Sequence, residues 1–472
     1  MSDSFGLVTA HPYMANSVPE IKREMLEAVG AKSVEELFEQ IPQEHRLTTP
    51  LQLPPALTSE LALRSHLLSL LGKNQTCEGN LNFLGAGCWQ HFVPGICDEI
   101  AARRELVTNI WGTSSSDHGR NQGLFEFCSE IAELVDLDCV GLPVYSWGCA
   151  AGHAIRMAAR LTGRREVLIP RLMDPQRLSV IRTYCEPVQN AGHITVRLVD
   201  YVMETGGISL ADLEAKISSS TAAVYFEMPS YIGAIDANAA AIANVARRFG
   251  AQVIVGVDPL SLGVLSAPPK YGADLVVGSI QPLGLHMLAG GSLGGFIASR
   301  DEERYVREFP TLLLSAAPTI EPGELGYSMT LLKQSSYDAR EQGKDWTGHT
   351  VHLWAQVCAA YMALLGPAGF AELGALVLSR SHYAAQRLQK LDGIRTLFGT
   401  GFFKEFVVNF DETGKSVAQI HRELRTRAIF GGKDLSVEFP ELGQSALYCV
   451  TEVHAQADID RLVDTLAEVI SK

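Results

Sequence analysis

The chain has 472 residues, of which 47% are apolar and 19% charged, the composition of a globular enzyme large enough for two domains. Its 53 acidic and 39 basic residues give a formal net charge of −14. This sign argues against nucleic acid or an anionic membrane as the main partner, because both select basic surfaces. The nine cysteines form no C-x-x-C pair, and the first residues lack a signal-peptide pattern, so we expect reduced thiols and a cytoplasmic location.

Residues 1–75 are predicted to form an N-terminal helical arm. Amphipathic helical patterns lie within 18–40 and near 59–72, with proline-rich turns between them. The arm is too thin to bury a core of its own, so we expect it to pack on another surface.

Residues 76–365 are predicted to form a large α/β domain. From about residue 139, short apolar runs alternate with helical stretches such as 148–161 and 237–249. The runs are continuously apolar, which is typical of strands covered on both faces in a mainly parallel sheet. The expected strands are 166–169, 194–199, 222–228, 252–257, 274–278 and 295–298.

Residues 366–472 are predicted to form a smaller α+β domain. A helical region at 350–365 ends at Gly366-Pro367, a pair that favours a break, and a second helix follows at 370–390. Strand-like runs at 404–409 and 446–451 and a last helix at 456–470 complete the pattern.

Asp258 is the first candidate site residue, because it directly follows the apolar run 252–257. Ligands of open parallel sheets bind at the carboxyl ends of the strands. A carboxylate there can pair with the pyridinium nitrogen of pyridoxal phosphate (PLP). The structural alternative is an aspartate that caps the turn made with Pro259.

A missing lysine sets this chain apart from a self-sufficient PLP enzyme. In PLP enzymes of this architecture the Schiff-base lysine sits just past the next strand, and here that position reads Ser279-Ile280-Gln281-Pro282. The sequence has no lysine between Lys270 and Lys333. Without an amine at this place, no covalent link to PLP can form there.

Several motifs resemble those of subunit 1 of the two-subunit glycine dehydrogenase (decarboxylating), the P-protein of the glycine cleavage system. The resemblance spans roughly 80 to 300 and extends to the N-terminus through HPY at 11–13 and EIKREMLEAVG at 20–30. Its motifs are FLGAG at 83–87, PSYIG at 229–233, VDPLSLG at 257–263, YGAD at 271–274 and QPLG at 281–284.

The resemblance implies fold type I of the PLP-dependent transferases, the aspartate-aminotransferase-like fold. In this family the PLP lysine belongs to subunit 2, and subunit 1 has proline at that position, as Pro282 does here. It therefore implies a heteromer that decarboxylates glycine and passes the aminomethyl group to a lipoylated H-protein. PLP would be bound covalently by the partner and not by this chain.

Four glycine or cysteine residues and Gln281 are further candidates for cofactor contact. Gly148 and Cys149 begin a helix whose free N–H groups suit a phosphate, although any helix start offers such groups. Gly290 and Gly291 lie where many such folds send a loop toward the neighbouring subunit's phosphate, or they form a simple turn. Gln281 precedes Pro282 directly.

Three residues are candidates for the substrate cleft: His118, Trp346 and His349. His118 lies in a polar segment that faces a cleft or is a solvated turn. Trp346 and His349 stand in a segment that departs from the family pattern, and they would add bulk and a titratable group beside a pocket for glycine. No set of side chains with metal-ligand spacing was found, so no metal is expected.

The sequence leaves other functions open. The complex could be a specialised paralogue that acts on another amino acid, or the chain could be a scaffold or regulatory subunit without chemistry. A self-sufficient PLP enzyme would need another lysine such as Lys270, which precedes its strand and so lies at the wrong end of the sheet.

Overall fold

The computed structural model describes residues 11, 13–47, 49, 51–107, 120–188, 192–287, 294–330, 339–347 and 351–471. The chain divides into two compact units, residues 1–74 and 75–472. The first unit contains helices α1 (Pro19–Ala28) and α2 (Glu60–Leu71), together with short 3-10 turns. The hydroxyl of Ser59 caps α2 by accepting the N–H of Ala62. Every residue of α2 is exposed, its leucines included.

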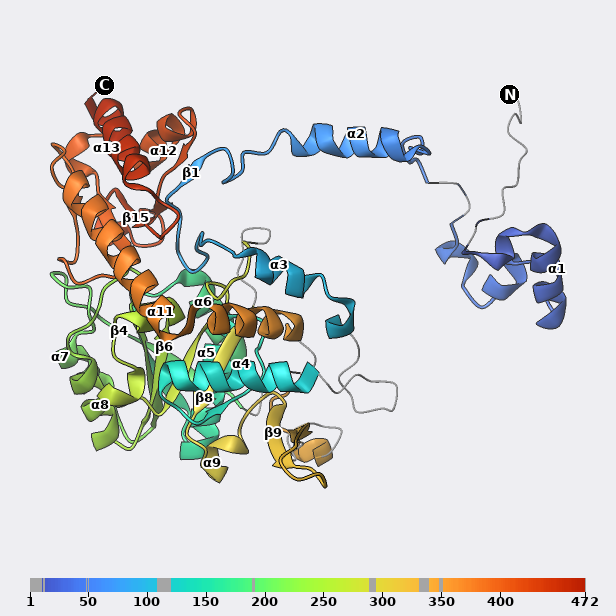
Figure 1. The fold of residues 1–472 in the computed structure, drawn as a ribbon, viewed down its shortest axis with the longest axis horizontal. Helices are drawn as coiled ribbons and strands as arrows, with labels where there is room; N and C mark the ends of the chain where they lie inside the picture. The colour runs from blue at the N-terminus through green and yellow to red at the C-terminus, as the bar shows by residue number, and fades with distance from the viewer. Residues whose placement is uncertain are drawn as a thin grey trace. The chain divides into compact units, whose positions relative to one another are not determined.

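The second unit is built around a seven-stranded sheet (Figure 1). Its strand order is β2-β8-β7-β6-β5-β3-β4, and the five strands from β7 to β4 run parallel. Strand β8 is antiparallel to β7, and β2 is antiparallel to β8. The α/β architecture expected from the apolar runs is confirmed. The strands are β2 (Cys139–Val140), β3 (Glu166–Pro170), β4 (Thr195–Val199), β5 (Thr221–Met228), β6 (Gln252–Val257), β7 (Leu275–Ser279) and β8 (Gly295–Ser299).

Helices cover both faces of this sheet, which explains why its strands are apolar throughout. Side chains of α4, α8 and the first half of α11 form one buried cluster with the sheet, and those of α5 and α6 form a second. The helices of this domain are α3 (Gly95–Ala101), α4 (Arg120–Val135), α5 (Trp147–Thr162), α6 (Pro175–Cys185), α7 (Leu210–Lys216), α8 (Ala239–Arg248) and α9 (Glu303–Val306). A hairpin of β9 (Leu313–Pro318) and β10 (Leu325–Thr330) follows α9.

Helix α11 (His352–Leu388) connects the large sheet to the smaller one. It bends at Gly366, whose φ of 56° and ψ of −179° are not helical, and Pro367 follows the bend. By length and composition alone α11 could cross a membrane; its first half packs against α3 and α4.

The smaller sheet has the order β11-β12-β15-β14 and packs against the second half of α11 and two further helices. A short parallel pair, β1 with β13, joins the segment after residue 80 to this domain. The elements are β1 (Leu81–Asn82), β11 (Arg395–Thr396), β12 (Glu405–Asn409), β13 (Ile429–Phe430), β14 (Lys433–Asp434), β15 (Ser445–Cys449), α12 (Val417–Arg425) and α13 (Gln456–Ser471).

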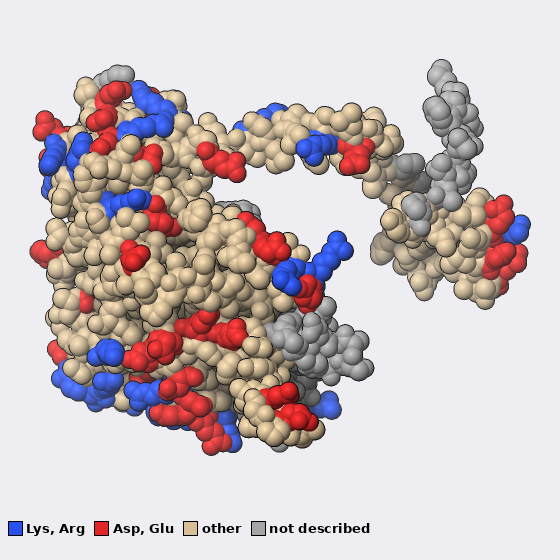
Figure 2. All heavy atoms as spheres, viewed as in Figure 1, with Lys and Arg blue, Asp and Glu red and all other residues tan. Residues whose placement is uncertain are grey.

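The surface carries charges of both signs. On the face drawn in Figure 2, Lys and Arg side chains lie among Asp and Glu side chains rather than in a continuous stripe. This mixture of signs on that face accords with the formal net charge of −14. All nine cysteines are free thiols in the structure.

Candidate functional site

Asp258 lies at the carboxyl end of β6, in the middle of the large sheet. Its Oδ1 accepts the N–H of Leu260 at 3.2 Å, so the turn-capping alternative is realised. Its Oδ2 lies 2.7 Å from Nζ of Lys404, which directly precedes β12 in the small sheet. The side chains of Asp258 and Lys404 are only 5% and 2% exposed. The carboxylate therefore has a cationic partner from within the same chain.

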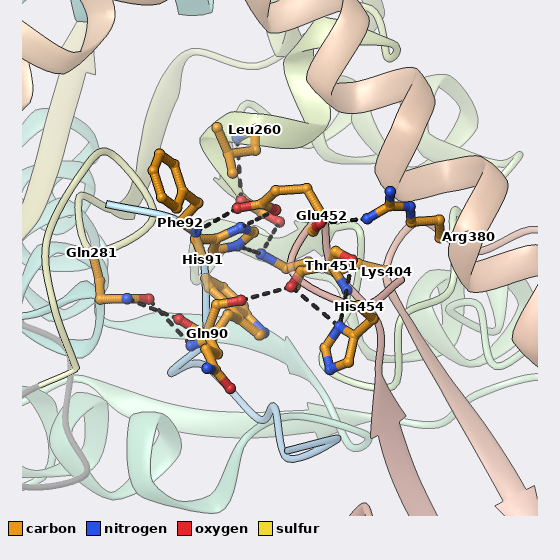
Figure 3. Close-up of polar contacts among 12 residues, drawn as sticks. Gln90, His91, Phe92, Leu260, Gln281, Arg380, Lys404, Thr451, Glu452 and His454 are labelled. Carbon is orange, nitrogen blue, oxygen red and sulfur yellow. Dashed lines mark hydrogen bonds and ion pairs between the residues drawn. The ribbon is translucent and has the colours of Figure 1, made fainter. Parts of the chain in front are cut away.

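Lys404 is surrounded by groups that suit an ammonium ion. Its Nζ lies 3.5 Å from the centre of the Trp89 ring and 3.1 Å from Nε2 of His91. This buried charge is therefore contacted by the carboxylate of Asp258, by the face of an indole and by an imidazole nitrogen. Figure 3 shows the ammonium of Lys404 directed toward His91.

His91 extends the network to Glu452. Its Nδ1 lies 2.8 Å from Oε2 of Glu452, and Oε1 of Glu452 accepts the N–H of Phe92 at 2.6 Å (Figure 3). Burial would raise the pKa of Glu452, but the imidazole of His91 and the N–H of Phe92 lower it to about 2. With Nδ1–H donated to this carboxylate, Nε2 of His91 is left to accept from Lys404.

Arg177 occupies the neighbouring part of the pocket. Its guanidinium donates from Nε and Nη2 to the two oxygens of Glu227 at 2.6 and 3.0 Å, and it lies 3.9 Å from the centre of the Trp147 ring. The hydroxyl of Tyr225 donates to the same carboxylate at 2.7 Å. Glu227 is the penultimate residue of β5, next to β6, so two carboxylates near this edge of the sheet are paired with cations of this chain.

These side chains leave almost no room in the pocket. The cavity lined by Trp89, Trp147, Arg177, Glu227, Asp258 and Lys404 holds about 10 Å³, roughly the space of one water molecule. Outside it lies an open groove of about 840 Å³. Residues lining this groove include Cys77, Cys88, Gly148, Arg177, Lys433 and Glu438.

Comparison with protein families gives one match, to the model described as glycine cleavage system P-protein, over residues 13–466. The chain belongs to the P-protein family. A protein of Staphylothermus marinus described as probable glycine dehydrogenase (decarboxylating) subunit 1 is 34% identical over 98% of this chain and 99% of its own length. A protein of Desulfitobacterium hafniense with the same description is 33% identical over 97% and 99%.

Solved structures agree with this assignment. A glycine decarboxylase (P-protein) of the glycine cleavage system, in inhibitor-bound form, matches with a TM-score of 0.84 and 30% identity, covering 98% of this chain and 99% of that one. A sphingosine-1-phosphate lyase of Burkholderia pseudomallei matches with a TM-score of 0.66 over 91% and 95% at 14% identity, and shows the fold alone. The fold is type I of the PLP-dependent enzymes, as the resemblance implied.

The residues of this P-protein chain do not fit PLP at the place where the fold would hold it. Lys404 pairs with Asp258 where a pyridinium nitrogen would need this carboxylate, and the cavity beside the pair has room for about one water molecule. Pro282 stands at the lysine position of the family. No chemical step of this chain can be assigned to a PLP bound in this pocket.

The family motifs are explained by close approaches of the backbone. A side chain on Gly85 would collide with Oε1 of Glu405, and one on Gly233, whose φ is 87°, would collide with the carbonyl oxygen of Glu405. A side chain on Gly263 would meet the carbonyl oxygen of Phe370. FLGAG, PSYIG and VDPLSLG are therefore places where the backbone closely approaches the part of the chain beyond residue 366.

Of the other residues expected to contact the cofactor, Gly148 lines the open groove and Gln281 contacts Trp89, which lines the closed pocket. Gly148 lines the groove at the start of α5, and the N–H of Cys149 is already accepted by the hydroxyl of Ser146 at 3.2 Å. Gln281 is buried, and its side chain binds the backbone N–H and carbonyl of Trp89 at 3.2 and 3.0 Å. Gln281 thus holds the segment on which Trp89 and His91 stand.

Of the remaining expected site residues, the structure describes only Trp346. Gly290, Gly291, His118 and His349 lie outside the described residues. Trp346 is partly buried and packs against the apolar cluster that also contains residues of α4 and α11. Among the described residues, no group of three or more His, Cys, Asp or Glu side chains could hold a metal ion.

Sequence reasoning missed Lys404, His91, Glu452, Arg177 and Glu227. One signal was present, since Lys404 and Glu405 open a run whose next residues are apolar, and a lysine directly before a buried strand is unusual. Lys404 and Glu452 lie 313 and 361 residues from His91 in sequence, so no local pattern could connect the three residues.

Proposed function

We propose that this chain is subunit 1 of a heteromeric, PLP-dependent glycine dehydrogenase (decarboxylating). The complex would decarboxylate glycine and transfer the aminomethyl group to the lipoyl arm of an H-protein. The PLP lysine would be supplied by subunit 2. This chain alone would be inactive, and its reduced thiols fit a cytoplasmic location.

The Asp258–Lys404 ion pair is the observation that carries this proposal. A self-sufficient PLP enzyme needs a free carboxylate for the ring nitrogen and a lysine for the aldehyde. Here the carboxylate is paired within the chain, and the lysine position is Pro282. The P-protein family membership and the relatives named subunit 1 support a cofactor that is held by a second subunit.

The chain's own contribution would be to complete the partner's site from across an interface. The 840 Å³ groove borders the closed pocket, and the start of α5 lines it at Gly148. Helix α2 exposes leucines around its surface, which is typical of a segment that a partner covers. Both features suit a subunit that shapes an active site without carrying its cofactor.

Co-expression with a lysine-bearing subunit 2 tests this function. The purified complex should release CO₂ from glycine in the presence of lipoylated H-protein, and neither subunit alone should do so. A panel of larger amino acids separates glycine from the substrate of a specialised paralogue. If the complex forms but turns over none of them, the chain is a scaffold and the proposed function is wrong.

A further inference from the structure

The Asp258–Lys404 pair has properties that distinguish it from an ordinary ion pair. Both side chains are almost fully buried, and the pair joins the end of β6 in the large sheet to the start of β12 in the small sheet. Removing two charges from water is costly, and surface ion pairs avoid this cost. A buried lysine at this place therefore needs every available compensating contact.

The surroundings of Lys404 supply these contacts from two segments of the chain, one around Asp258 and one that contains Trp89 and His91. Asp258 lies 2.7 Å from Nζ, His91 lies 3.1 Å from it, and the Trp89 ring faces it at 3.5 Å. Gln281 fixes the backbone of Trp89, and Glu452 fixes the ring of His91. The ammonium thus sits in a built cation site with an acidic group, a nitrogen acceptor and an aromatic face.

We propose that Lys404 is a built-in occupant of the degenerate cofactor pocket. Its ammonium takes the cationic place opposite Asp258 that a protonated ring nitrogen would take, and it lies over the ring of Trp89. The pocket is therefore a cation site filled by the protein itself, which closes it to pyridoxal-type ligands. The same contact locks the small sheet against the edge of the large one.

This assignment makes a specific prediction about ligand chemistry. Lys404→Ala removes three methylene groups and the ammonium, which together are the fragment n-propylammonium. The variant should bind n-propylammonium in the vacated site, between the carboxylate and the indole. It should not respond to 1-propanol, which has a similar chain and no charge.

The experiment measures thermal unfolding of the full-length chain, co-expressed with its partner where it needs one. Lys404→Ala should lower the unfolding midpoint by several degrees, and millimolar n-propylammonium should restore much of the loss. Wild type and Lys433→Ala are the controls. Lys433 pairs with Glu438 near the same groove, but both side chains are partly exposed. Lys433→Ala should therefore change the unfolding midpoint little, and n-propylammonium should not raise the midpoint of this variant.

A second pair of variants covers the case in which Lys404→Ala does not fold. Lys404→Met leaves Asp258 buried without a partner, whereas Asp258→Asn with Lys404→Met removes both charges. The double variant should recover most of the midpoint lost by Lys404→Met. An unfolded or equally destabilised double variant overturns the proposal, as does a Lys404→Ala chain that is as stable as wild type or indifferent to the amine.

Discussion

The carboxylate of Glu405 accepts the backbone N–H of Ala86 at 2.6 Å inside the protein core. Glu405 is the neighbour of Lys404, and Ala86 lies in the FLGAG motif. Burial raises the pKa of Glu405 from its ordinary value of 4.5 to about 7, although the nearby Lys404 partly offsets this effect. The protonation of one buried carboxyl is thereby linked to the contact between the FLGAG motif and the start of β12.

Glu405 should make the chain less stable as the pH rises from about 5 to 7. Below pH 4.5 both the folded and the unfolded chain carry the proton, and between 4.5 and about 7 only the folded chain does. Glu405→Gln keeps an acceptor for the N–H of Ala86 and removes the titrating group. The free energy of unfolding of wild type should therefore fall by on the order of 3 kcal/mol relative to that of the variant across this pH window.

Denaturant unfolding of both proteins at several pH values measures this difference. Glu452, whose pKa is lowered to about 2, weakens both proteins equally as the pH falls below 4.5 and therefore cancels. A difference in free energy that does not change between pH 5 and 8 would show that Glu405 is ionised in the folded chain throughout.

Gly233→Ala should be among the most damaging small substitutions in the family motifs. The residue has a φ of 87°, and a Cβ would collide with the carbonyl oxygen of Glu405, a backbone atom that cannot rotate away. Strain and displacement together should cost more than about 3 kcal/mol. Gly414→Ala is the matched control, because its φ of 69° is similar and a Cβ there meets nothing within 4 Å. Equal free energies of unfolding for the two variants would remove the close-contact explanation.

The leucines of α2 should contribute to the interface with the partner subunit. Leu61 and Leu68 lie one above the other on the helix and are 74% and 53% exposed. Changing both to serine should weaken association with subunit 2 by about tenfold or more, without changing the stability of residues 75–472. Titration calorimetry or size exclusion against the partner measures this loss, with Arg64→Ser on the same helix as the control. Unchanged affinity would place α2 outside the interface.

The sheet could be predicted from the sequence because its physical cause is local. The runs that became β5, β6 and β7 are continuously apolar, and burial on both faces demands this pattern. The bend in α11 could be predicted for the same reason, because Gly366 and Pro367 act on the backbone conformation of the residues next to them.

The contents of the pocket could not be predicted in this way. Lys404 and Asp258 are far apart in sequence, and no local spacing connects the two residues. Asp258 was correctly placed at the sheet edge, but its partner came from the other domain. Glu227 was hidden within an apolar run, and its pairing with Arg177 depends on how α6 packs beside β5. Such contacts depend on the tertiary fold and produce no recognisable residue spacing in the sequence.

The most direct test of the central claim is to locate the cofactor in the co-expressed complex. Borohydride reduction followed by peptide mapping should find the phosphopyridoxyl group on one lysine of subunit 2 and on no lysine of this chain. Lys404 is the residue to inspect first, because its amine lies inside the pocket beside Asp258. A stoichiometric adduct on Lys404, on Lys270 or on any other lysine of this chain would contradict the account.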